Sequence, residues 1–211
     1  MAARNGWTGY GSGAGVPLTA RPRRSRSRGL RLSELPLRSV AVPAVKPGPV
    51  RILGLDPGSQ VTGYGLVDVG TRGLTYVASG SIRTGTGTFA GRLHEVFLQV
   101  GSLVREYSPG EVAIERVFMH RNPDSALKLG QARGAALCGL HGSGADVFEY
   151  APREVKLAVT GTGAAQKEQV QHMIKALLAI EGRLGLDASD ALALAVCHAN
   201  HRVLLALGAR P

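Results

Sequence analysis

The chain has 211 residues, a length that suits one domain with an extension, and a formal net charge of +10. Its longest apolar run, Ala191–Cys197, is far shorter than the ~18 residues that cross a membrane, so we expect no membrane segment. The two cysteines, Cys138 and Cys197, are too far apart for a CxxC zinc or redox motif. We therefore expect a soluble, cytoplasmic protein whose two thiols are reduced and buried.

The positive charge is concentrated in residues 1–49, which hold eight Arg and one Lys against a single acid, and six of the eleven Pro. No apolar periodicity is visible there, so we expect a disordered basic extension before a folded domain over residues 50–211. Three explanations stay open for the extension: a nucleic-acid-binding arm, an organelle transit peptide, or an upstream stretch wrongly included in the reading frame. We favour the third, because GTG, one of the codons for valine, also starts translation in bacteria, which makes Val50 a candidate start.

Apolar patterning predicts alternating strands and helices from Val50 onward. Alternating or continuous apolar runs bounded by turn residues predict five strands, at Val50–Asp56, Val61–Val69, Leu74–Ile82, Glu111–Glu115 and Asp146–Tyr150. Helical spacing predicts five helices, at Ala90–Tyr107, Ser125–Leu140, Pro152–Val159, Gln166–Ile180 and Ala188–Leu207. Strands that come first and then alternate with helices indicate an α/β domain, with a mixed sheet covered by helices.

Four carboxylates stand at positions where an α/β fold can gather them. Asp56 ends the first strand before a Pro-Gly turn, and Glu115 ends another strand before an apolar stretch. Asp187 and Asp190 are spaced i, i+3 at the start of the last helix, so they share one face. Each also has an ordinary structural explanation, because Asp is favoured in turns and at helix N-termini.

Taken together, the four acids indicate a site for metal ions. Carboxylates within a few Å repel one another and raise each other's pKa. Hard divalent cations such as Mg²⁺ or Mn²⁺ relieve that repulsion, because they prefer oxygen ligands. Two such ions ~3.5–4 Å apart are a common device for phosphodiester hydrolysis. The pattern therefore favours a nuclease.

Six segments, in collinear order, resemble the RuvC family of crossover junction endodeoxyribonucleases. They are Gly54–Ser59 (GLDPGS), Thr62–Gly65 (TGYG), Ala113–Phe118 (AIERVF), Asn122–Gly134 (NPDSALKLGQARG), Gly161–Val170 (GTGAAQKEQV) and Asp187–Ala193 (DASDALA). The resemblance implies an RNase H-like fold with a mixed five-stranded sheet flanked by helices. It also implies a homodimer that resolves four-way (Holliday) DNA junctions by paired symmetric nicks, in recombination and DNA repair.

The same resemblance assigns roles to seven residues. The catalytic, metal-binding carboxylates carry over onto Asp56, Glu115, Asp187 and Asp190, with two Mg²⁺ per site for which Mn²⁺ can substitute. Lys156 and Lys167 match basic residues near the scissile phosphate, and Phe118 matches an aromatic that inserts into the junction. Beyond these, Arg121, Lys128 and Arg133 are expected to line the DNA path, with ordinary surface charge as the alternative for each. The RuvA–RuvB branch-migration complex is the implied partner.

Two other functions also fit part of this sequence. The Asp56-Pro-Gly-Ser turn also resembles the first phosphate loop of actin-like ATPases and sugar kinases, which need two lobes and more chain than residues 50–211 provide. A non-catalytic junction binder would keep the fold without the metal site, but all four acids are present. His198 and His201, spaced i, i+3, have no neighbours in the sequence that complete a zinc site, so we expect structural roles for both.

Overall fold

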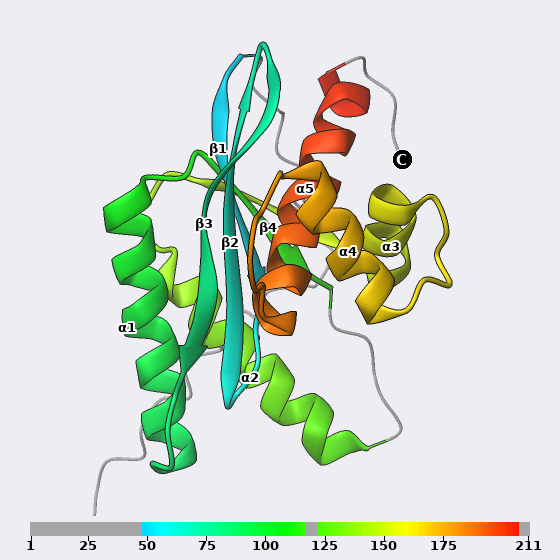
Figure 1. The fold of residues 1–211 in the computed structure, drawn as a ribbon. Coiled ribbons are helices and arrows are strands. Elements are labelled where there is room, and N and C mark those ends of the chain that lie inside the picture. The colour runs from blue at the N-terminus through cyan, green and yellow to red at the C-terminus, as the bar shows by residue number, and fades with distance from the viewer. Residues whose placement is uncertain (1–47, 117–121, 207–211) are drawn as a thin grey trace, which may run out of the picture. The chain divides into compact units, whose positions relative to one another are not determined.

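The computed structural model describes residues 48–116 and 122–206 (Figure 1). These residues form a five-stranded mixed sheet in the order β3-β2-β1-β4-β5, with strands β1 (Val50–Asp56), β2 (Val61–Gly70), β3 (Gly73–Arg83), β4 (Glu111–Glu115) and β5 (Asp146–Tyr150). The first three strands form an antiparallel meander, and β4 and β5 continue it in parallel with β1. The mixed sheet expected from the sequence is confirmed.

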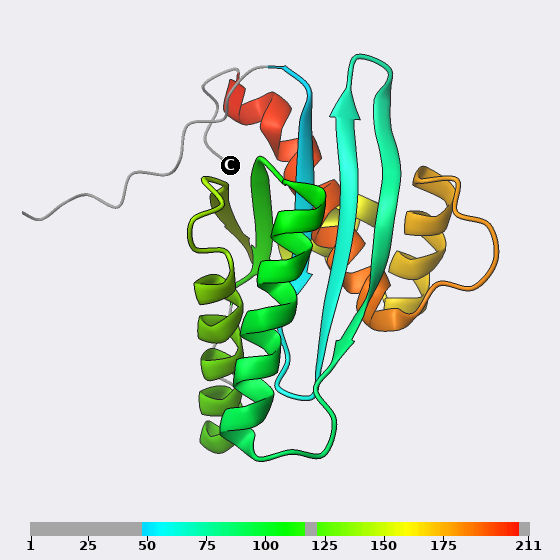
Figure 2. The same cartoon turned by 90° about the vertical axis from the view of Figure 1, so that its left-hand side faces the viewer.

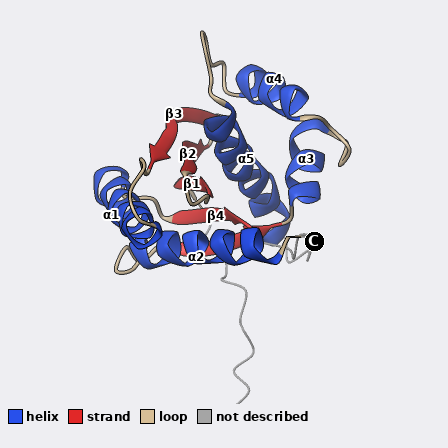
Figure 3. Cartoon of the chain, turned by 90° about the horizontal axis from the view of Figure 1, so that it is seen from below, coloured by secondary structure: helices blue, strands red, loops and turns tan. Residues whose placement is uncertain are grey.

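Helices cover both faces of this sheet (Figure 3). They are α1 (Phe89–Tyr107), α2 (Pro123–Gly139), α3 (Pro152–Thr160), α4 (Lys167–Leu177) and α5 (Leu186–Ala206). One core lies between the sheet and the pair α1 and α2, which run side by side in Figure 2. A second core lies on the opposite face, under α5 with α3 and α4 packed against it. None of the helices in the described ranges combines the length and apolarity needed to span a membrane.

Glycines let α5 rest directly on the backbone of the sheet. A Cβ atom added at Gly54 would lie 1.9 Å from the Ala191 carbonyl oxygen, and one at Gly63 would lie 2.1 Å from the Asp187 carbonyl oxygen. No side chain fits in those spaces, so the two strands must carry glycine there. Because Gly63 pairs with Asp56 in the β1–β2 register, this packing brings the first turn of α5 to the end of β1.

The predicted strands agree with the observed ones to within one residue at each end, whereas several predicted helix ends are wrong. Helix α2 begins at Pro123 rather than Ser125, because the Asn122 side chain accepts hydrogen bonds from two backbone N–H groups and caps the helix there. Helix α4 ends at Leu177 rather than Ile180, and Ala179 just beyond adopts a left-handed φ of 50°. Residues 1–47 and 207–211 lie outside the described residues, so the expected disorder of the extension is not tested.

Candidate active site

Two strand ends and one helix start place the four predicted carboxylates around one edge of the sheet. Asp56 is the last residue of β1, and Glu115 is the last residue of the parallel neighbour β4. Side chains alternate along a strand, and Ala113 of β4 belongs to the core under α5. Glu115 therefore faces α5, whose first turns carry Asp187 and Asp190, both half-buried.

The electrostatics show that these carboxylates act on one another. Burial raises the pKa of Asp56 to about 7, and the negative charges of Glu115, Asp190 and Asp187 contribute to that increase. The positive charge of Lys167 opposes it. The end of β1 therefore holds an acid whose deprotonation is disfavoured unless positive charge is brought to it.

Lys167 is the cation that contacts this acidic cluster. It is the first residue of α4, and its Nζ lies 2.9 Å from Oδ2 of Asp190. The hydrogen bond and charge of Asp190 raise the pKa of Lys167, and Asp56 and Glu115 add to the effect. Lys156 lies half-buried on α3, which packs against α5. The structure thus brings Lys167 into the cluster and places Lys156 on a neighbouring helix.

A serine that sequence reasoning missed also reaches the cluster. Ser81 on β3 donates a hydrogen bond from Oγ to Oδ2 of Asp187, at 3.5 Å. The strand registers explain the meeting, because Gly63 pairs with Asp56 on one side and with Ser81 on the other. The sequence predicts this contact only if the residue pairing of both hairpins, β1–β2 and β2–β3, is known.

The predicted DNA-contacting residues have different surroundings. Lys128 lies exposed on α2 and pairs with Asp124 one turn earlier, with 2.6 Å between Nζ and Oδ2. Arg133 is less exposed, and its guanidinium contacts the backbone of Glu115 and the Glu149 carboxylate. Phe118 and Arg121 lie outside the described residues, so their expected roles are not tested.

The chemistry of the donors fits divalent metal ions, although their present arrangement does not complete a coordination sphere. Carboxylate oxygens are the ligands that Mg²⁺ and Mn²⁺ prefer, and the raised pKa of Asp56 reflects its burial together with the negative charges of the other three acids. The Lys167 ammonium supplies one compensating positive charge. Within residues 48–116 and 122–206, however, no three His, Cys, Asp or Glu side chains are arranged to hold one ion.

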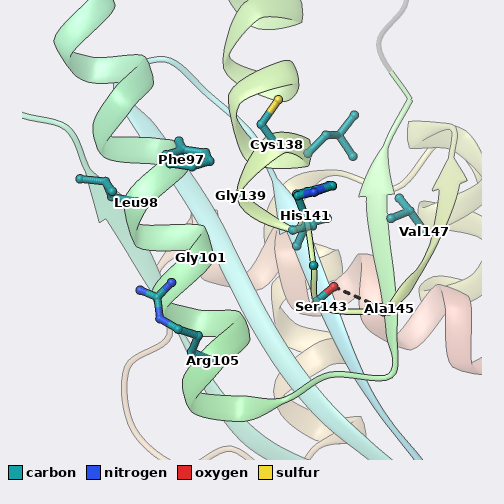
Figure 4. A pocket seen from close by; sticks show the side chains of 14 residues that line it. Phe97, Leu98, Gly101, Arg105, Cys138, Gly139, His141, Ser143, Ala145 and Val147 are labelled. Carbon is teal, nitrogen blue, oxygen red and sulfur yellow. Dashed lines mark hydrogen bonds between the residues drawn. The ribbon is translucent and has the colours of Figure 1, made fainter.

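A separate pocket of about 790 Å³ lies between α1 and the end of α2, and Figure 4 shows its lining. Its wall includes Phe97, Leu98, Cys138 and Val147, and none of the four predicted carboxylates lines it. The expectation that both thiols are buried is wrong for Cys138, which lies exposed because its position on α2 faces away from the sheet core. Cys197 on α5 is buried, as expected, and both thiols are free.

Comparisons with known proteins give the family. The family described as "Crossover junction endodeoxyribonuclease RuvC" matches residues 52–198. The chain is 56% identical over 155 residues to the RuvC of Methylococcus capsulatus, covering 74% of this chain and 93% of that protein. It is 55% identical over 151 residues to the RuvC of Chromohalobacter salexigens, covering 72% and 81% respectively.

A solved structure agrees with these sequence matches. The structure described as "T. thermophilus RuvC in complex with Holliday junction substrate" superposes with a TM-score of 0.68 at 30% identity, covering 73% of this chain and 96% of that chain. The fold and the matched residues 52–198 therefore agree on one family. This chain belongs to the RuvC family of crossover junction endodeoxyribonucleases.

Proposed function

We propose that this protein is a metal-dependent endonuclease that resolves four-way (Holliday) DNA junctions by paired symmetric nicks. The observation that carries the proposal is the cluster of four carboxylates at the ends of β1 and β4 and the start of α5, where the pKa of Asp56 is raised to about 7. A non-catalytic junction binder would have no need for such mutually repelling acids. Family membership and the junction-bound relative from T. thermophilus support DNA junctions as the substrate.

In this proposal Asp56, Glu115, Asp187 and Asp190 hold two Mg²⁺ ions, which Mn²⁺ can replace. When bound, the metal ions supply activation of the attacking water and charge stabilisation at the leaving 3′ oxygen. The chain's contribution is a set of oxygen ligands on rigid elements, two of them at strand ends and two in the first turns of α5. Because Asp56 must lose its proton to act as a ligand, a raised pKa couples metal binding to proton release.

The two lysines act on the phosphate in this proposal. Lys167 is hydrogen-bonded to Asp190 without metal, and neutralisation of Asp190 by a cation would free the ammonium for the scissile phosphate. A lysine ammonium is a compact charge on a flexible stem, so it can follow charge that develops in the transition state. Lys156, on the adjacent helix α3, is proposed to contact the same phosphate region.

DNA binding and assembly complete the proposal. Phe118 stacks on bases at the junction, and Arg121 and Lys128 contact the phosphate backbone. Residues 48–116 and 122–206 carry one such cluster of four acids, so paired nicks on opposite strands require a second copy, and we propose that the protein is a homodimer. We also propose that RuvA–RuvB delivers the junction and that the protein acts in the cytoplasm.

The nuclease domain is proposed to be residues 50–211, and residues 1–49 a basic extension absent from the natural protein. The family match that begins at residue 52 supports this division. Peptide mapping of the endogenous protein tests it, because abundant peptides from residues 1–49 would contradict a start at Val50.

A nuclease assay on a synthetic four-way junction tests the function. Purified protein should cut opposite strands at symmetric positions in Mg²⁺, leave 5′-phosphate and 3′-hydroxyl ends, and stop when the metal is chelated. A linear duplex of the same sequence is the substrate control, and Glu115→Gln is the protein control. Tight junction binding without cleavage in either Mg²⁺ or Mn²⁺ would leave the non-catalytic binder as the correct function.

A further inference from the structure

Arg133 is a charged residue whose hydrogen bonds are made inside the protein. It lies on α2, and its side chain is only 19% exposed. Its Nε donates to the backbone carbonyl oxygen of Glu115 at 3.3 Å, and its Nη2 donates to Oε1 of Glu149 on β5. The guanidinium thus joins α2 to the ends of two neighbouring strands.

The carbonyl that Arg133 contacts lies where the β4 ladder ends. Glu115 is the last residue of β4 and pairs with Tyr150 of β5. One further backbone hydrogen bond follows, from Arg116 N to the Tyr150 carbonyl oxygen at 2.8 Å. A side-chain donor at this position fixes the peptide plane after Glu115, and that plane sets the direction of the Glu115 side chain.

Glu149 contacts two arginines, Arg133 through its carboxylate and Arg116 through its backbone carbonyl oxygen, which accepts from Nη2 of Arg116 at 3.3 Å. An ion pair with one partly buried partner is less screened than an exposed pair such as Lys128 with Asp124 on the same helix. The contacts therefore form a closed set around the end of β4, which we call the Glu115 clamp: Arg133, Glu149 and Arg116.

The clamp acts from the opposite side of the sheet to the acidic cluster. Ile114 belongs to the core beneath α1 and α2, so its neighbour Glu115 directs its side chain to the other face, towards α5. Arg133 on α2 therefore contacts the backbone of Glu115 and acts on the carboxylate only through it.

We propose that Arg133 is a positioning residue that holds Glu115 for metal binding and cleavage, in place of the phosphate contact expected from the sequence. The proposal rests on the metal-dependent nuclease function proposed above. It also gives a role to Glu149, whose negative charge would repel DNA. In this proposal that charge orients the Arg133 guanidinium. A metal ligand displaced by about 1 Å costs on the order of 100-fold in rate, which sets the scale of the expected effect.

Three variants and one control separate positioning from phosphate binding. Arg133→Ala removes the clamp, Arg133→Lys keeps the charge without the planar fork, and Glu149→Gln removes the charge that orients Arg133. Arg105→Ala is the control, because it removes an exposed arginine on α1 that hydrogen-bonds only Ser102 among the described residues. Each protein is measured for melting temperature, Mn²⁺ affinity without DNA, junction Kd in EDTA at several salt concentrations, and single-turnover cleavage at saturating enzyme.

The proposal expects a specific pattern of losses. Arg133→Ala and Glu149→Gln should lower the single-turnover rate by about 10- to 100-fold and weaken Mn²⁺ binding, with Kd and its salt slope unchanged. Arg133→Lys should stay slow although its charge is retained, and Arg105→Ala should match the wild type. The pattern that overturns the proposal is a weaker Kd and shallower salt slope for Arg133→Ala at an unchanged rate and Mn²⁺ affinity, with tighter junction binding for Glu149→Gln. If the wild-type protein never cleaves, the nuclease function proposed above is refuted instead. The Mn²⁺ affinities of the variants relative to the wild type would then still show whether Arg133 positions Glu115.

Discussion

Two glutamates on the same face of β4 have opposite electrostatic surroundings. Glu111 begins the strand, Glu115 ends it, and both face α5. Glu111 meets Arg202 near the end of α5, whereas Glu115 lies with Asp56 and Asp190 near its start. One strand and one helix thus form a compensated buried charge at one end and an acidic end at the other, where Lys167 pairs with Asp190 and the pKa of Asp56 stays raised. A compensated charge indicates a structural role, whereas a buried acid held at a raised pKa among other acids indicates a site for a cationic ligand.

The Glu111 end is a buried hydrogen-bonded network. Arg202 donates to both oxygens of Glu111, with Nε–Oε2 at 2.6 Å and Nη2–Oε1 at 3.1 Å. His198 contacts Oε2 through Nε2 at 2.8 Å, and its Nδ1 lies 2.6 Å from the Tyr150 hydroxyl. Burial lowers the pKa of His198, so the imidazole is neutral, donates to Glu111 and accepts from Tyr150. The expectation of a structural role for His198 agrees with these contacts.

The largest effect is expected at the acidic end. Asp56→Asn should lower cleavage by about a thousand-fold or more, because it removes a ligand on which both metal binding and water activation depend. Junction binding should be unchanged or tighter, since a negative charge facing DNA is lost. The same outcome is expected for Glu115→Gln, Asp187→Asn and Asp190→Asn. Single-turnover cleavage and junction titrations measure both quantities, and near-wild-type nicking by any of these variants would contradict the ligand assignment.

Glu111→Gln is the matched change at the compensated end. It removes the carboxylate charge that accepts from both Nε and Nη2 of the buried Arg202 guanidinium, so the free energy of unfolding should fall by about 3 kcal/mol. Cleavage measured well below the melting temperature should be retained. Glu115→Gln, by contrast, relieves repulsion and should leave stability unchanged or higher. Urea unfolding of both variants provides the comparison, and equal stability losses would show that the two ends do not differ as argued.

Sequence patterns predicted the strands better than the helix ends. Period-2 and continuous apolar runs located all five strands, since a buried strand needs apolar residues throughout. The start of α2 was missed because the cap depends on Asn122 in a particular backbone conformation, and Asn-Pro is also typical of turns.

Only those residues of the candidate site that lie at strand ends or within family motifs were predicted from the sequence. Asp56 and Glu115 could be placed because parallel strands end at the same edge. The contact of Ser81 with Asp187 depends on two hairpin registers, and the Arg133 contact depends on the packing of α2 across the sheet. Such contacts between distant segments leave no local pattern in a single sequence.

Lys167→Ala tests whether the cation at the acidic end serves catalysis. The single-turnover rate should fall by about 10- to 100-fold because charge stabilisation of the transition state is lost. Junction Kd should change much less, because one exposed lysine is a small part of the phosphate contacts. Lys175→Ala is a suitable control, because it removes a half-buried lysine of α4 that hydrogen-bonds the Gly182 carbonyl oxygen and no group of the acidic end among the described residues. A larger effect of Lys167→Ala on Kd than on rate would assign it to binding.

The compensated end should also determine part of the stability at mildly acidic pH. The pKa of His198 is lowered from 6.5 in the folded protein, so below that pH the unfolded chain binds a proton that the folded chain does not. The free energy of unfolding should therefore fall as pH drops from 7 to 5, by at most about 1.4 kcal/mol per pH unit from this group. His198→Asn should be less stable at pH 7 but lose less stability on acidification. Parallel slopes for both proteins would remove His198 as the cause.

The acidic end contains a buried hydroxyl, that of Ser189, without a hydrogen-bond partner among the described residues, whereas the buried polar groups of the compensated end are hydrogen-bonded. Ser189 lies between Asp187 and Asp190 on α5. Burying a hydroxyl unpaired costs about 1–3 kcal/mol, so Ser189→Ala should raise the free energy of unfolding by about 1 kcal/mol once lost packing is included.

Cleavage by Ser189→Ala decides what the hydroxyl does. If cleavage is unchanged and urea unfolding shows the gain in stability, the Ser189 hydroxyl has no part in cleavage. The first turns of α5 are then arranged to place Asp187 and Asp190, and not for optimal packing around them. Ser102→Ala on the exposed surface of α1 is the control for removal of a hydroxyl, and it should leave both quantities unchanged. If Ser189→Ala instead lowers the cleavage rate, the hydroxyl serves the acidic end directly, since an apolar replacement of similar size leaves the packing of α5 intact.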